Sequence, residues 1–177
     1  RLMLAGLLEQ QEKIEAAEKQ YKVLVREASS DDQLKVLLAR FYARHHRDDE
    51  AEKVLRELMA AHPEKQVFCL ELARFFSGQK KRDAMTRVLR GCIDSNPEGF
   101  KAYEMLALGL LSDQRYDEAL EVVDRFMARV KTGPEFLRAK LIKATIYFRE
   151  KKTDMAFNLV GEILDENPRD VKAHALK

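Results

Sequence analysis

Apolar residues recur along the whole chain at the spacing of amphipathic helices. They form pairs of stripes, of which one pair comprises Leu34, Leu37, Leu38 and Phe41 and then Ala51, Val54, Leu55 and Leu58. Stripes of this period predict helices that each bury one face, whereas a half-buried strand needs strict alternation, which no stretch shows. A short polar turn separates the two stripes of each pair, so the pattern predicts antiparallel helix pairs and no strand.

The stripes and turns place the helices with some precision. We expect first helices near 32–45, 66–79, 100–113 and 135–150, and second helices near 48–61, 82–95, 116–129 and 153–166. An aspartate stands near the start of each second helix, where a carboxylate favours the helix dipole; these are Asp48, Asp83, Asp117 and Asp154. Prolines that end a helix follow three of the second helices, at Pro63, Pro97 and Pro168.

The helix pairs repeat at a fixed interval. Ala5, Ala39, Ala73 and Ala107 lie 34 residues apart, whereas Ala144 lies 37 beyond Ala107. A period of this size is typical of a solenoid built from stacked repeats. We expect small alanines to be buried where two helices approach closely, and we expect the longest turn at 130–134, where the slip of three residues falls.

The period and the residues resemble the tetratricopeptide repeat (TPR) family. One repeat carries the family's residues at Leu38, Ala39, Tyr42, Ala51, Leu55, Leu58 and Pro63, and the resemblance covers the whole chain. It implies an all-α fold, a right-handed α-solenoid of stacked antiparallel helix pairs (the TPR superhelix). We expect a single array over residues 1–177, divided into a partial repeat 1–31, repeats 32–65, 66–99, 100–136 and 137–170, and the start of a further repeat at 171–177. Both ends fall inside helical patterns, which indicates a fragment of a longer protein.

Composition narrows the classes of function. The chain has 32 basic and 30 acidic residues, and this near-neutral balance argues against a nucleic-acid-binding solenoid, which needs a basic surface with stacking aromatics. No apolar run approaches the roughly 20 residues of a membrane span, so we expect no direct membrane insertion. The glycines form no phosphate loop or dinucleotide fingerprint, and His45 and His46 lack a metal-site motif. We therefore expect no enzyme, no metal and no cofactor.

The two cysteines, Cys69 and Cys92, lie on apolar stripes of one repeat, one in each helix. Buried free thiols are the favoured interpretation because cysteine is often buried, and a disulfide is the alternative. Cysteine usage therefore does not choose between a cytoplasmic and a periplasmic location.

The resemblance also implies where a ligand binds, because in TPR arrays the first helices line a concave groove. Carrying the family's inward positions over to this sequence gives a candidate peptide-binding groove made of Val36, Arg40, Arg44, Leu70, Arg74, Lys101, Leu108, Leu111, Arg138, Leu141, Phe148 and Arg149. The inward positions include Glu104 as their one acidic residue, so basic side chains stand among apolar ones. Arginine binds carboxylates with paired hydrogen bonds, which favours an acidic and amphipathic peptide.

Two functions follow from these features. The first is a protein–protein interaction scaffold that binds a peptide or partner-protein segment in its concave groove. The alternative is a structural spacer or assembly module of a larger complex, because the phrases at 165–168 and 116–119 resemble those of bacterial envelope export and polysaccharide proteins. We also expect self-association through the ends of the array, since Leu2, Leu4, Leu7 and Leu8 stand at the N-terminal end without a preceding repeat.

Overall fold

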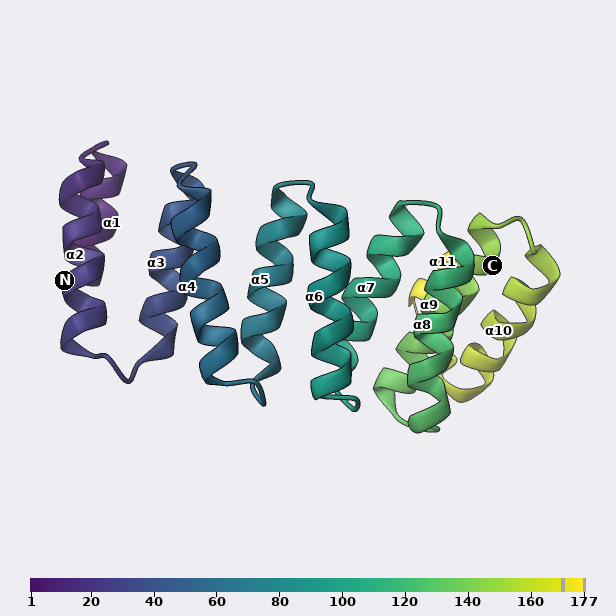
Figure 1. Cartoon of the computed structure of the whole chain (residues 1–177). Helices are drawn as coiled ribbons and strands as arrows, with labels where there is room; N and C mark the ends of the chain where they lie inside the picture. The colour runs from purple at the N-terminus through teal and green to yellow at the C-terminus, as the bar shows by residue number, and fades with distance from the viewer. Residues whose placement is uncertain (170, 177) are drawn as a thin grey trace. The chain divides into compact units, whose positions relative to one another are not determined.

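Every regular element in the part of the chain that the computed structural model describes, residues 1–169 and 171–176, is an α-helix (Figure 1). The helices are α1 (Leu2–Gln10), α2 (Ile14–Glu27), α3 (Asp32–Arg44), α4 (Asp48–Ala61), α5 (Gln66–Gly78), α6 (Arg82–Ser95), α7 (Phe100–Ser112), α8 (Tyr116–Arg129), α9 (Pro134–Arg149), α10 (Thr153–Glu166) and α11 (Val171–Leu176). The all-α fold expected from the sequence is confirmed, and the helices form consecutive packed pairs.

The chain forms two compact units, residues 1–81 and residues 82–177. In the first unit, α1 packs on α2, α2 on α3, α3 on α4 and α4 on α5. In the second unit the same succession runs from α6 to α11, and α7 also contacts α9 while α9 contacts α11. These extra contacts place the first helices of successive repeats side by side. The division into one array of repeats stays a prediction.

The helix bounds agree closely with those expected, but the expected long turn is wrong. Helix α9 has 16 residues, whereas α3, α5 and α7 have 13 each. The linker 130–133 is no longer than the linkers 62–65 and 96–99, so the three additional residues extend the helix instead. Pro134 at the first turn explains this, because its fixed φ starts a helix without the loss of a hydrogen bond. Gly133, with φ of 97°, turns the chain into it.

The turn inside each repeat closes with the same hydrogen bonds. Its central residue has φ between 57° and 63°, at Glu12, His46, Lys80, Gln114 and Lys151. At the last of these, Lys151 N–H donates to Phe148 O at 3.1 Å and Lys152 N–H donates to Tyr147 O at 2.9 Å, and the other four turns repeat this pattern. This is a Schellman motif, which satisfies the final carbonyls of a helix and ends it. The same turn geometry therefore recurs along the backbone at the period seen in the sequence.

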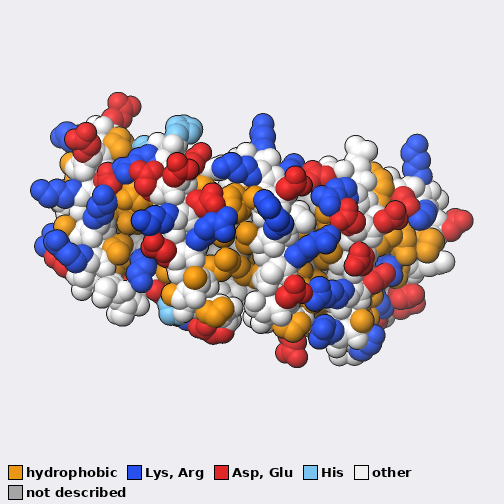
Figure 2. Space-filling view, in the orientation of Figure 1, with side chains coloured by type: hydrophobic (Ala, Val, Ile, Leu, Met, Phe, Trp, Pro, Cys, Tyr) orange, Lys and Arg blue, Asp and Glu red, His pale blue; other side chains and the backbone are white. Residues whose placement is uncertain are grey.

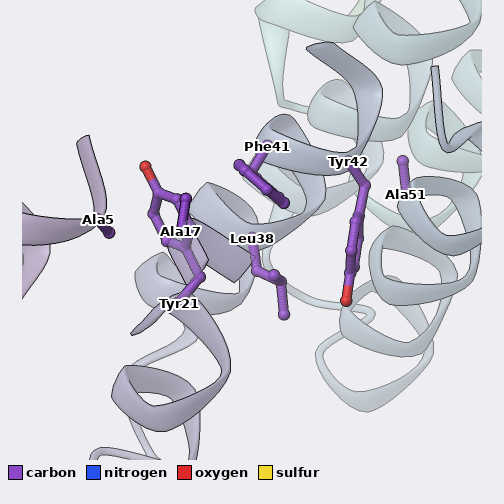
Figure 3. Packing of buried hydrophobic residues seen from close by; sticks show 7 residues of the cluster. All are labelled: Ala5, Ala17, Tyr21, Leu38, Phe41, Tyr42 and Ala51. Carbon is purple, nitrogen blue, oxygen red and sulfur yellow. The ribbon is translucent and has the colours of Figure 1, made fainter. Parts of the chain in front are cut away.

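Small alanines and aromatic rings together build the core of the first unit. Figure 3 shows this cluster, in which Ala5 and Ala17 are fully buried and the rings of Tyr21 and Phe41 lie with their centroids 5.0 Å apart. An alanine allows two helix backbones to approach, and large side chains from the neighbouring helix fill the space around it. The repeat therefore needs a small residue at one position and bulky residues beside it.

The second unit follows the same rule. Ala107 and Ala144 are fully buried, as is Phe126, whose ring lies 4.8 Å from the ring of Phe100 and 5.3 Å from that of Tyr103. In the first unit, Ala73 is equally buried. The expected burial of the signature alanines is confirmed.

The expected state of the cysteines is wrong. Cys69 and Cys92 are both buried, as expected, but both are disulfide-bonded and neither is a free thiol. Helical stripes in a sequence indicate burial, but they do not give the distance between two sulfurs, and that distance decides whether a bond can form.

A network of charges around Glu18 joins the first two repeats. Arg47, in the turn after α3, donates to Glu18 at 2.6 Å and to Glu50 at 2.7 Å, and Tyr42 Oη donates to Glu18 at 3.2 Å. Burial raises the pKa of Glu18, but the hydrogen bonds from Arg47 and Lys22 outweigh it and lower this pKa to about 2. The ionised Glu18 carboxylate therefore stabilises the folded state.

We predict that Ala107→Leu lowers the free energy of unfolding by about 1–3 kcal/mol, because the larger side chain overpacks the approach of α7 to its neighbours. Ala128→Leu, at an exposed position of α8, is the matched control and should change stability little. Thermal and chemical unfolding measure both variants. Equal stability of the two variants would contradict the close packing at Ala107.

We predict that Lys151→Gly raises the free energy of unfolding by about 1 kcal/mol, because a side chain at φ of 63° is strained and glycine is not. Lys131→Gly is the control, since Lys131 is exposed and lies outside the positive-φ positions. That control should show no gain. A loss of stability in Lys151→Gly, measured by urea unfolding, would contradict the assignment of this turn.

We predict that acid destabilises the wild-type protein more than the Glu18→Gln variant. The pKa of Glu18 is lower in the folded than in the unfolded state, so its contribution is present above about pH 4.5 and is lost as the pH falls toward about 2. Urea unfolding at a series of pH values measures this. Glu15→Gln, at an exposed position of the same helix, should keep the wild-type pH dependence, and parallel curves for wild type and Glu18→Gln would refute the prediction.

Candidate functional site

The second unit contains an open cavity of about 880 Å³ beside its first helices. Its wall comes from α7, from the start and middle of α9, and from the segment between α10 and α11. The lining residues are Glu104, Leu108, Gly133, Pro134, Leu137, Arg138, Leu141, Ile142, Thr145, Glu166, Asn167, Arg169 and Val171. Apolar side chains make up much of this lining, and a few charged groups stand among them, which is the usual composition of a ligand site.

A smaller cavity of about 390 Å³ adjoins the first. It is lined by Leu108, Leu111, Ser112, Gln114, Tyr116 and Arg149, so Leu108 belongs to both. The side chain of Leu108 is 45% exposed although it is apolar. An exposed leucine between two cavities is a point where a partner can bury apolar surface.

The structure brings five of the seven expected groove residues of the second unit onto the two cavities. Leu108, Arg138 and Leu141 line the larger cavity, and Leu111 and Arg149 line the smaller one. Phe148 is half exposed and Lys101 is exposed, but neither of them lines a cavity.

The first unit buries two of the expected groove residues. Val36 packs against Leu58 and Phe68, and Leu70 is also buried. These two side chains belong to the hydrophobic core and offer little surface to a ligand. The exposed candidates in this unit are its three arginines.

Two of those arginines share one carboxylate. Arg40 on α3 donates from Nε and Nη2 to the two oxygens of Glu71 on α5, at 3.1 and 2.8 Å. Arg74, also on α5, donates to Glu71 at 2.6 Å. Glu71 is only 7% exposed, whereas both guanidinium side chains are about half exposed. A buried glutamate thus holds one arginine from each of two successive first helices.

The third arginine also has a carboxylate partner. Arg44 donates to both oxygens of Glu9 on α1, at 2.8 and 2.9 Å, and Tyr21 Oη donates to the same carboxylate at 3.3 Å. The Nε2 atom of His45 lies 3.0 Å from it. The hydrogen bonds from Arg44 lower the pKa of Glu9, although burial acts in the opposite direction.

The second unit repeats the shared-carboxylate arrangement at the cavity. Lys101 Nζ lies 3.3 Å from Glu104, and Arg138 Nε on α9 lies 2.5 Å from the other oxygen of Glu104. Glu104 is 9% exposed, and the two basic side chains are about half exposed. Glu104 therefore holds both basic side chains in place while their positive charges stay accessible to solvent.

The sequence pattern did not identify several residues of the site. Glu71 lies one position away from the inward positions of the family, although its spacing of three residues from Arg74 is a signal for a helical ion pair. Leu137 was missed because it lies seven residues before Ala144, one position outside the inward positions carried over from the family. Asn167 and Arg169 lie in the linker after α10, and helical periodicity does not place linker side chains.

Charges of both signs alternate on the face of the molecule shown in Figure 2, with hydrophobic side chains visible between them. None of the helices in residues 1–169 and 171–176 is long and apolar enough to cross a membrane. Among those same residues, no group of three His, Cys, Asp or Glu side chains is arranged to hold a metal ion.

Several solved structures share this fold. MamA aligns with a TM-score of 0.65 and 18% identity over 95% of this chain and 96% of that one. A thermophilic TPR protein from Thermus thermophilus aligns with a TM-score of 0.61 and 17% identity over 98% of this chain and 93% of that one. YrrB, a TPR protein with an unusual peptide-binding site, gives a TM-score of 0.62 and 18% identity over 98% of this chain and 89% of that one. At these identities the similarity shows the fold alone.

Sequence comparison gives the family. Among proteins of curated function, none matches the chain in sequence. The tetratricopeptide repeat family model matches residues 2–65 and 104–171, which is most of the chain. Binding and scaffold roles are typical of this family, whose members are typically adaptors without enzymatic activity. The chain therefore belongs to the tetratricopeptide repeat family.

Proposed function

We propose that the protein is a binding scaffold without catalytic activity, and that it binds a segment of a partner protein in the two adjoining cavities of its second unit. The observation that carries this proposal is the exposed Leu108 side chain, which lines both cavities. Buried apolar anchors in well-packed pockets supply most of the affinity of protein interfaces. The larger cavity, about 880 Å³, has room for more than one side chain of a partner.

The charges around the cavities favour an acidic and amphipathic partner. The two lining carboxylates already have cationic partners, since Glu104 binds Lys101 and Arg138 while Glu166 accepts a hydrogen bond from Lys140 at 2.6 Å. Arg149 and Arg169 also line the cavities, and within the described residues neither forms an ion pair. The positive charges thus exceed the negative ones. Such an excess orients an acidic segment and speeds its association.

The exposed arginines of the first unit form a second set of candidate contacts. Arg40, Arg44 and Arg74 each reach solvent while bound to Glu71 or Glu9. Reversal of their charge would place additional carboxylates beside a buried one and disturb the fold. The cavities of the second unit therefore offer a cleaner test of the proposed function.

We predict that Leu108→Glu abolishes recovery of the partner from an extract of the native host, because it places a charge between the two cavities. Met155→Glu is the matched control, since Met155 is 46% exposed on α10 and lies outside both cavities. Both variants should keep the helical circular dichroism of the wild type. Recovery of the partner should also fall as salt rises, because screening weakens exposed charges beyond roughly 8–10 Å.

Equal recovery of partners by the wild type and Leu108→Glu would contradict binding in the cavities. That result would favour the alternative of a structural spacer, whose contacts lie elsewhere on its surface. Loss of the partner in Met155→Glu but not in Leu108→Glu would locate the interface on α10 instead.

A further inference from the structure

Glu104 lies between two cations that hold equivalent positions in successive repeats. Lys101 on α7 and Arg138 on α9 are 37 residues apart, the same step that separates Ala107 from Ala144. Each lies within ion-pair distance of a different oxygen of Glu104, at 3.3 and 2.5 Å. Two like charges on adjacent first helices repel each other, and a carboxylate between them turns that repulsion into attraction.

The first unit shows the same arrangement independently. Arg40 and Arg74 also hold equivalent positions, 34 residues apart, and they share the buried carboxylate of Glu71. In both units two half-exposed cations bind one buried carboxylate, and the three side chains together carry a net charge of one positive unit. The shared carboxylate thus occurs in both units, with different residues and at different positions of the repeat. It is therefore not a chance contact of a single surface side chain.

The pair beside the cavity retains donors for a ligand. A guanidinium has five N–H donors and an ammonium has three. Glu104 engages the Nε–H donor of Arg138 and one of the three N–H donors of Lys101. Glu104 and Arg138 both line the larger cavity, close in sequence to the apolar wall residues Leu108 and Leu141. An anion bound to the pair is therefore placed beside an apolar pocket.

We propose that Lys101 and Arg138 form an anion subsite for one carboxylate, and that Glu104 sets its charge. The occupant is a segment of a partner protein in which an Asp or Glu side chain stands near a large apolar residue. The carboxylate binds the cation pair while the apolar side chain enters the cavity beside Leu108. This inference rests on the proposed function of the cavities.

The charge of the subsite selects among anions. A single carboxylate matches a net charge of one positive unit, whereas a phosphoserine carries about −1.5 to −2 at neutral pH. Glu104 repels phosphoserine more strongly than it repels a carboxylate, because the repulsion grows with the charge of the ligand. Loss of the Glu104 charge therefore strengthens the binding of a phosphoserine peptide more than the binding of the same peptide with Glu in that position.

The test begins with an unbiased selection of peptides from a random phage library on the wild-type protein. The selected peptides should contain an acidic residue near Leu, Ile or Phe, and Leu108→Glu should weaken their binding at least tenfold. Fluorescence anisotropy then compares three versions of one selected peptide, with Glu, Gln or phosphoserine in the acidic position. The ratios of their dissociation constants isolate the charge preference of the subsite from general effects on folding.

Two variants should move these ratios in opposite directions. Glu104→Gln raises the net charge of the subsite to two positive units and should shift the preference toward phosphoserine by about tenfold. Arg138→Gln lowers the net charge to zero and should reduce the preference for Glu over Gln by about tenfold. Arg87→Gln, at an exposed position of α6 outside the cavities, is the control and should change neither ratio.

Each other outcome overturns a defined part of the account. Two results would overturn the subsite and leave the proposed function intact. The first is that the selected peptides require Leu108 but show no preference for an acidic residue. The second is that Glu104→Gln leaves the ratios of the dissociation constants unchanged. A purely structural Glu104 would weaken all three peptides equally, and that result also overturns the subsite. Failure to select any peptide that depends on Leu108 would overturn the proposed function together with the subsite.

Discussion

The close approach of paired helices at small alanines is the constraint on which the rest of this structure depends. Ala5, Ala17, Ala107 and Ala144 have no exposed surface, and bulky side chains from the neighbouring helices pack around them. Because that packing recurs with each repeat, every repeat must place its first helix, its Schellman turn and its second helix in the same relation. The contacts between α7 and α9, which set the walls of the larger cavity, follow from this relation.

A second constraint arises from the repetition itself. Equivalent positions on successive first helices carry cations, at Arg40 and Arg74 and again at Lys101 and Arg138. Repulsion between neighbouring repeats would oppose their packing if these charges had no counter-ion. A buried glutamate between each pair removes that problem and fixes the two basic side chains. The same interaction that holds adjacent repeats together therefore presents positive charge on the candidate binding surface.

The sequence predicted the helices well because their signals are local and repeated. Hydrophobic stripes, polar turns and the 34-residue period each placed the bounds of α3 to α8 independently. The slip before Ala144 was visible, but its location was not, because either a longer linker or a longer helix fits the same numbering. Pro134 decides between them, since proline is well suited to the first turn of α9.

The candidate site was predictable only in part. The positions of Leu108, Arg138 and Leu141 follow from the family's inward positions, and the structure places all three on one cavity. Glu71 was missed because a pattern of inward positions does not show which charges pair with each other. The disulfide state of Cys69 and Cys92 depends on a distance in space that spacing in the sequence does not fix.

Binding in the cavities of the second unit is the central claim, and methyl NMR spectroscopy with a bound peptide tests it most directly. Titration of a selected peptide into protein with labelled leucine methyl groups should shift the signals of Leu108, Leu137 and Leu141, which line the larger cavity. The signals of Leu55 and Leu89, which are buried elsewhere, should stay in place. Shifts confined to leucines outside the cavities, with Leu108 unchanged at saturation, would contradict the account.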